Sequence, residues 1–410
     1  MSKVLFILNT FYPFSRQEDF LANEMQLVSG FKKIVVFPNS ISSKDSFPLY
    51  KLPANTIFVK NKYPYKKVLG KCIWGCLFNK AFYYEIIDLI CSRRFTISRF
   101  RYLLSFMLYS ENSYNTVSDY IKTHNITDEI VVYSYWLHTS AFVGCCIKNK
   151  FHNVKAVVSR CHRFDLYEYA NEFNYIPQRK FILSNLDEIY SISEHGIRYL
   201  NGKYPDYVNK YKLYRLGTFD RGMSSVVNGN VLRIVSCSWM RRVKRIHRIF
   251  ESIKDATYPI EWTHFGDGET FEEIKKLVDS NNNSNVNIIL AGNTRNDVVI
   301  ESYVKNSYDI FVNVSENEGV PVSIMEAMSC GLIPVATDVG GTGELIDNEL
   351  NGFLMPRDFK NCQLKGIIDR IYKMSSDEKK QIKKQARDKW EQEYNALKNY
   401  KTFYAHLNKI

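Results

Sequence analysis

Short apolar runs alternate with amphipathic stretches along most of the chain. Runs rich in Val, Ile, Phe and Tyr predict buried strands, and longer stretches with apolar residues three or four apart predict helices. The predicted strands form two series: Val4–Leu8, Ile34–Phe37, Ile130–Ser134, Val154–Ser159 and Glu188–Ile192, then Val231–Cys237, Glu261–Phe265, Val286–Leu290, Asp309–Val314 and Ile333–Ala336. This alternation is typical of parallel α/β layers and not of a repeat array.

A segment rich in Gly, Ser and Asn, residues 218–230, separates the two series and is the predicted linker. The chain has 410 residues, of which 45% are hydrophobic, so it is long enough for two domains of about 200 residues, each with its own core. We therefore expect an α/β protein in which two Rossmann-like domains, residues 1–217 and 231–390, face a central cleft. Residues 391–410 have apolar positions at helical spacing and predict a closing helix.

The most informative stretch follows the predicted strand at 309–314. Residues 316–319 form a turn, Pro321 suits a first helical position, and Gly331 suits the helix stop. A helix start at the carboxyl end of a parallel strand favours phosphate binding. Glu318 and Glu326 lie on the order of 10 Å apart if the helix rises about 1.5 Å per residue, which suits the two ends of one extended ligand. An ordinary strand, turn and helix with a surface Glu is the alternative.

Together with residues 331–344, this stretch resembles the donor-site signature of the retaining family 4 glycosyltransferases, which have the GT-B fold. Glu318 and Glu326 match the family's E-x7-E motif. The resemblance implies that Glu318 contacts hydroxyls of the donor sugar and Glu326 the nucleotide ribose. The donor would also be contacted near Gly319, Val320 and Pro321. In this fold the C-terminal helix often returns to the first domain.

A strongly basic turn opens the second domain after the strand at 231–237. Family members usually have a Gly-Arg-Leu triplet and then a Lys, and both cations hold the donor diphosphate. Lys244 matches, whereas Trp239 stands in place of the Arg. Three other arginines of the turn are candidates for the missing charge: Arg241, Arg242 and Arg245. A basic solvated turn is the alternative. Further on, Gly266 and Asp267 form a glycine turn that borders the nucleotide base in the family.

In the first domain, residues 159–168 resemble the Arg-x-His-x-x-Asp-Leu-Tyr segment of a bacterial polysaccharide branch of the family. The resemblance implies that His162 faces the reacting sugar, although a lone His in a loop is more often structural. Arg160 and Asp165 hold either the loop or the acceptor. Glu194 follows the next predicted strand and is placed near the acceptor or the interdomain cleft.

The resemblance implies transfer of a sugar, with retention, from a nucleotide diphosphate sugar to a saccharide or lipid-linked saccharide in capsule, exopolysaccharide or lipopolysaccharide assembly. The expected catalytic residues are His162, Lys244 and Glu318. The departing phosphate would help deprotonate the acceptor while Lys244 stabilises its charge. Because the sequence contains no D-x-D, we expect neither a metal ion nor another cofactor.

Charge is uneven along the chain. Residues 1–220 hold 29 Lys and Arg against 18 Asp and Glu, whereas the rest hold 26 against 25. Residues 51–110 hold 11 basic residues and only Glu85 and Asp88 as acids, interleaved with aromatics. This pattern indicates either a solvated helical face or an anionic partner, with a bilayer surface favoured over nucleic acid.

No uncharged apolar run reaches the 18 or so residues of a membrane span, and the nine cysteines include no C-x-x-C pair. The chain begins directly with a strand pattern and shows no signal peptide. A cytoplasmic protein, with its basic domain at the inner face of the membrane, is therefore expected.

Two alternatives remain open. One is another GT-B sugar-nucleotide enzyme, such as an epimerase or a phosphorylase. The other is a noncatalytic membrane-surface scaffold, which Trp239 and the replacement of a loop glycine by Ser15 favour. The retained functional residues argue against the scaffold: Glu318, Glu326, Lys244 and His162.

Overall fold

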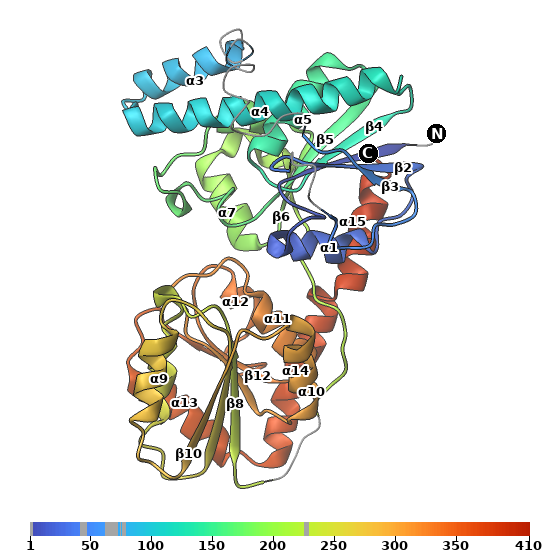
Figure 1. The fold of residues 1–410 in the computed structure, drawn as a ribbon. Coiled ribbons are helices and arrows are strands. Elements are labelled where there is room, and N and C mark those ends of the chain that lie inside the picture. The colour runs from blue at the N-terminus through green and yellow to red at the C-terminus, as the bar shows by residue number, and fades with distance from the viewer. Residues whose placement is uncertain (1–2, 42–46, 62–72, 74, 76–78, 225–228) are drawn as a thin grey trace. The chain divides into compact units, whose positions relative to one another are not determined.

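The computed structural model describes residues 3–41, 47–61, 73, 75, 79–224 and 229–410. The chain divides into two compact units, Met1–Tyr214 with Tyr400–Ile410, and Arg215–Asn399 (Figure 1). Residues 225–228 of the predicted linker lie outside the described residues, as do residues 62–72, 74 and 76–78 of the basic aromatic segment.

The first unit contains a seven-stranded parallel sheet with the order β3-β2-β1-β4-β5-β6-β7. Its strands are β1 (Val4–Asn9), β2 (Lys33–Pro38), β3 (Thr56–Phe58), β4 (Ile130–Ser134), β5 (Val154–Cys161), β6 (Glu188–Ser191) and β7 (Tyr211–Leu213). The chain order reverses between β1 and β4, which pair directly. The carboxyl ends of these two strands therefore border a crevice of the kind that binds ligands in open α/β sheets.

Helices cover both faces of this sheet. They are η1 (Arg16–Glu18), α1 (Asp19–Met25), α3 (Lys80–Cys91), α4 (Ile97–Thr123), α5 (Thr139–Lys150), η2 (Glu168–Ala170), α6 (Arg179–Asn185), α7 (Glu194–Lys203), η3 (Pro205–Lys210) and α15 (Ala396–Leu407). Alternate β1 residues face opposite sides: Leu8 packs with α4, α5 and α6, whereas Ile7 packs with α1 and α15.

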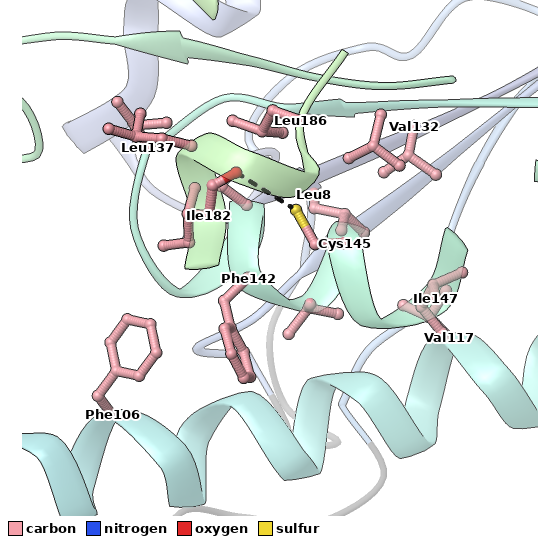
Figure 2. Close-up of a cluster of buried hydrophobic side chains, with 14 of the residues drawn as sticks. Leu8, Phe106, Val117, Val132, Leu137, Phe142, Cys145, Ile147, Ile182 and Leu186 are labelled. Atoms are coloured by element: carbon pink, nitrogen blue, oxygen red, sulfur yellow. Dashed lines mark hydrogen bonds between the residues drawn. The ribbon is translucent and has the colours of Figure 1, made fainter. Parts of the chain in front are cut away.

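Figure 2 shows the first of these cores, in which side chains from α4, α5 and the strands interdigitate. The thiol of Cys145 lies within it and donates a hydrogen bond to the carbonyl of Ile182, with a distance of 3.9 Å. On the opposite face, the Phe403 ring of α15 packs edge-on against Tyr133 and Tyr190. The last turns of the chain are thus part of the first unit's core.

The second unit contains a six-stranded parallel sheet with the order β10-β9-β8-β11-β12-β13. Its strands are β8 (Leu232–Cys237), β9 (Ile260–Phe265), β10 (Val286–Gly292), β11 (Ile310–Asn313), β12 (Ile333–Thr337) and β13 (Phe353–Met355). Its helices are η4 (Arg242–Lys244), α8 (His247–Ile253), α9 (Phe271–Asp279), α10 (Asn296–Lys305), α11 (Val322–Ser329), α12 (Thr342–Leu345), α13 (Asn361–Lys373) and α14 (Ser376–Glu393).

The predicted α/β class with two Rossmann-like domains is confirmed, and all ten predicted strands are present. The three strands that sequence reasoning missed, β3, β7 and β13, each have three residues and lie at sheet edges. Such short edge strands exist through their pairing with a neighbour, so their own residues carry little periodic signal.

Candidate functional site

Two residues that the sequence singled out separately meet in the second unit. Lys244 ends η4, after β8, and Glu318 lies in the turn after β11. The Nζ of Lys244 lies 2.6 Å from Oε1 of Glu318, and both side chains are half-buried. Asn313, the last residue of β11, donates its side-chain amide to the same oxygen at 3.2 Å. The carboxyl ends of β8 and β11 therefore hold a cation, a carboxylate and an amide in contact.

Arg245 ties the two loops of this site together. Its guanidinium donates to the carbonyls of Val314 at 2.8 Å, Ser315 at 3.2 Å and Arg357 at 2.9 Å. Burial, the largest cause, lowers the pKa of Arg245 from its ordinary value. With three carbonyls bound to its guanidinium, Arg245 positions these loops, and its contact with a donor stays a prediction.

The rest of the basic turn packs against the glycine turn after β9. The amide of Met240 donates to the carbonyl of Asp267 at 2.9 Å, and the amide of Arg242 donates to Glu269. A Cβ on Gly266, which has φ +140°, would lie 1.9 Å from the carbonyl oxygen of Ser238. Gly266 is therefore required for this close approach, whereas a contact of Gly266 and Asp267 with a base stays a prediction.

The Glu318 turn is supported from behind by two glycines. Gly341 donates its amide to the carbonyl of Gly319 at 2.6 Å. Gly340 has φ +58°, and a Cβ there would lie 2.1 Å from the carbonyl oxygen of Glu318. The backbone of residues 340–341 thus holds the backbone of Glu318 and Gly319 in position.

Gly340→Ala is expected to lower the free energy of unfolding by about 1–3 kcal/mol, since it combines a left-handed backbone with a backbone collision. It should also weaken nucleotide binding, because the collision displaces the Glu318 turn. Denaturant unfolding and calorimetry measure the two effects. Gly366→Ala on α13, where an added Cβ meets nothing within 4 Å, is the matched control. Equal stability of the two variants would contradict the prediction.

Glu326 lies on the second turn of α11, as predicted. Asn296, at the start of α10, donates its side-chain amide to Glu326 at 2.9 Å. Burial raises the pKa of Glu326 to about 7, although the residue is only half-buried overall. Pro321 is the N-cap of α11 and not its first helical residue, and no side chain caps this end.

In the first unit, His162 begins the loop after β5. Its ring packs against Tyr135 and Trp136, with ring centroids 4.7 and 4.5 Å away. Its Nδ1 lies 3.8 Å from the carboxylate of Asp165, and among the described residues neither ring nitrogen has a hydrogen-bond partner. Both nitrogens are buried, and a contact of His162 with a sugar stays a prediction.

Arg160 does not contact an acceptor, because its side chain is completely buried. Its guanidinium lies 3.3 Å from Glu24, donates to the hydroxyl of Tyr133 at 2.8 Å and stacks over the ring of Phe403. Burial raises the pKa of Glu24, and the Arg160 charge opposes that shift. The structure corrects the acceptor prediction for Arg160, which instead joins α1, the sheet and α15.

Asp165 is also fully buried and holds the loop. One carboxylate oxygen accepts from the amide of His162 and the other from the amide of Leu137, both at 2.7 Å. Its prediction as an acceptor ligand is therefore corrected to a positioning role for His162. Glu194, at the start of α7, is exposed and forms a 3.7 Å ion pair with Arg198, and its acceptor role stays a prediction.

Sequence reasoning missed Glu18, a buried carboxylate that organises the loop after β1. It accepts from five groups: the side chains of Asn9 and Trp136 and the amides of Thr10, Phe11 and Tyr12. Its position three residues after Ser15, at a helix start, was the available signal. Glu18 thereby joins the loops after β1 and β4.

These loops enclose a cavity of about 250 Å³ that lies wholly within the first unit. Its aromatic lining includes Tyr102, Phe106 and Trp136. Asn39 contributes a buried side-chain oxygen without a hydrogen-bond partner among the described residues. His138, also in the wall, has its pKa lowered to about 4 by burial and is neutral. Apolar ring faces next to polar groups match the surface of a sugar.

Among the described residues, no group of three or more His, Cys, Asp or Glu side chains could hold a metal ion. In the same part of the chain, no helix has both the length and the apolar character that crossing a membrane requires. Metal independence stays a prediction.

Residues 224–389 match the family model described as Glycosyl transferases group 1. The matched residues lie within the second unit, apart from residues 225–228 outside the described part of the chain. Over 275 residues, the chain is 26% identical to an uncharacterized glycosyltransferase of Methanocaldococcus jannaschii, a match that covers 64% of this chain and 70% of that one. It is 38% identical over 90 residues to the Escherichia coli UDP-Gal:alpha-D-GlcNAc-diphosphoundecaprenol alpha-1,3-galactosyltransferase, of which it covers 22%.

Solved structures match the chain over its full length. The lipopolysaccharide outer core galactosyltransferase WaaB matches 100% of both chains with a TM-score of 0.69 and 14% identity. Anabaena Alr3699/HepE in complex with UDP matches 100% of both chains with a TM-score of 0.66, also at 14% identity. At this identity the likeness shows the fold, and it confirms the predicted GT-B class.

Proposed function

We propose that this protein is a group 1 glycosyltransferase, which transfers a glycosyl group with retention at the anomeric carbon from a nucleotide diphosphate sugar to a saccharide hydroxyl. The contact between Lys244 and Glu318 is the observation that carries the proposal. It places a cation for a diphosphate directly beside a carboxylate that can accept from sugar hydroxyls. A structural neighbour in complex with UDP supports a nucleotide donor.

In the proposed reaction, the bond between the anomeric carbon and the phosphate oxygen breaks while the acceptor oxygen bonds to that carbon on the same face. The acceptor proton passes to the departing phosphate. Lys244 stabilises the charge on the leaving group. Glu318 orients the sugar, Glu326 accepts from the ribose, and the uncapped start of α11 offers amides to the donor. His162 offers its unpartnered nitrogens to a sugar hydroxyl.

For the acceptor we propose a lipid-linked saccharide, used in assembly of a cell-surface polysaccharide at the cytoplasmic face of the membrane. The Escherichia coli relative is named for its activity on a diphosphoundecaprenol-linked sugar, which supports this class. The aromatic and polar cavity behind Trp136 fits a sugar ring of such an acceptor.

Calorimetric titration of UDP, GDP and ADP into the metal-free protein tests the proposal. We expect saturable binding with a preference for one nucleotide, which would select the sugar donors for transfer assays. Absence of binding to all three would favour a noncatalytic scaffold. Donor turnover without any saccharide acceptor would instead indicate an epimerase. Activity lost to a chelator and restored by manganese would overturn metal independence.

A further inference from the structure

Helix α3 is apolar on two opposite sides. Phe82, Ile86 and Leu89 pack into the core of the first unit. On the other side, Tyr84, Ile87 and Ile90 are 70%, 56% and 56% exposed, and Tyr83 is 48% exposed. A surface helix of a globular protein normally turns a polar stripe to water. The outward side of α3 is therefore apolar and exposed, where a surface helix normally presents polar residues.

The acidic residues of α3 do not supply such a stripe, because both are bound to other parts of the unit. The hydroxyl of Tyr175 donates to Glu85 at 2.7 Å, and Nζ of Lys180 lies 2.6 Å from Asp88. Glu85 is half-buried, and the side chain of Asp88 is 40% exposed but paired with Lys180. Both acids of α3 are thus bound to other side chains of the unit.

The apolar surface continues through the turn into α4, which lies alongside α3 (Figure 1). Phe95 is 43% exposed and Ile97 is 73% exposed. Two exposed arginines flank them, Arg93 and Arg101, and neither has an ion pair among the described residues. Their neighbour Arg94, by contrast, is paired with Glu168 at 2.8 Å. Unpaired positive charge therefore accompanies the apolar surface.

We propose that the outer α3 surface docks the protein on a bilayer that contains anionic lipids. We define this surface by its exposed residues: Tyr83, Tyr84, Ile87, Ile90, Phe95 and Ile97, with Arg93 and Arg101. The apolar side chains enter the boundary between headgroups and acyl chains, while the arginines bind lipid phosphates. A second copy of this surface would bring like charges together, so charge complementarity favours an anionic membrane. This inference does not depend on the proposed reaction.

Vesicle flotation tests the surface with the full-length protein. Wild type is expected to bind vesicles with about 30% phosphatidylglycerol at least tenfold more tightly than pure phosphatidylcholine vesicles, with the preference reduced at high salt. Ile87→Glu with Ile90→Glu should lower binding to the anionic vesicles by at least about tenfold, because it removes apolar burial and adds repulsion. Arg93→Gln with Arg101→Gln should lower mainly the anionic preference.

The matched control replaces two exposed apolar residues outside this surface, Val298→Glu with Leu397→Glu. It should leave vesicle binding unchanged. Unchanged thermal unfolding and nucleotide binding of the Ile87 and Ile90 variant would show that the fold and donor site are intact. Three results would overturn the proposal: no vesicle binding by wild type, equal loss in the control, or a dimer in light scattering that this variant dissociates while vesicle binding persists.

Discussion

Replacing Lys244 with alanine is expected to lower the rate of glycosyl transfer by about 10²–10³-fold, the scale found when one charge-stabilising group is removed from an active site. Lys244 meets Glu318 at the carboxyl ends of β8 and β11, and Arg245 beside it is bound to three carbonyls. Arg245 is therefore poorly placed to replace the lost charge. The change should also weaken nucleotide diphosphate binding, because Glu318 then faces the phosphates without its cation. Transfer kinetics and calorimetry measure both effects.

Two controls separate the role of Lys244 from general electrostatics and from the unpaired Glu318. Lys275→Ala removes an exposed cation of α9 in the same unit and should change the rate by less than about threefold. Lys244→Ala combined with Glu318→Gln removes both charges of the pair. If the double variant regains most of the transfer rate, the loss came from the unpaired carboxylate and Lys244 has no direct role in the reaction.

At pH 8, Glu326→Gln is expected to stabilise the protein and to weaken nucleotide binding. At pH 5, neither effect is expected. The pKa of Glu326 is about 7 in the folded protein, above its unfolded value of about 4.3. The folded state therefore binds the extra proton between these values, and stability falls as pH rises through that window. Above pH 7 the ionised group lowers the free energy of unfolding by about 1–3 kcal/mol. This range is smaller than the full pKa difference implies, because solvent screens a half-buried group. Glutamine does not ionise and lacks this cost.

The same ionised carboxylate is the form that accepts hydrogen bonds from ribose hydroxyls in the proposed function. Wild type should therefore bind its preferred nucleotide about tenfold more tightly than Glu326→Gln at pH 8, and about equally at pH 5. Comparing the two proteins at each pH cancels the titration of the nucleotide itself. Glu301→Gln, at an exposed acid of α10, is the control for charge. A stability difference of the same size at both pH values would contradict the assignment.

The positions of Glu318 and Glu326 in the fold were predictable because a local pattern was sufficient. Glu318 and Glu326 occupy the turn and helix expected of them, because an apolar run, a glycine and a proline define a strand, turn and helix within some 20 residues. The first-unit prediction was less complete. Arg160 and Asp165 lie near the carboxyl end of β5 as expected, but both side chains are fully buried. Their partners, Glu24 and Leu137, are distant in sequence, so no local pattern could reveal that burial.

The sequence by itself determined the two parallel sheets, the position of the loops after β8 and β11, and the choice of Lys244, Glu318 and Glu326 as candidates. These depend on periodicity and turn chemistry over short distances. Only the tertiary structure decided which charges are available. In the folded protein, Arg245 binds backbone carbonyls and Lys244 is paired with Glu318. The pKa of Glu326 is raised, and the outer side of α3 is apolar and exposed. Burial and pairing depend on contacts between segments far apart in the chain, and those contacts form only in the folded protein.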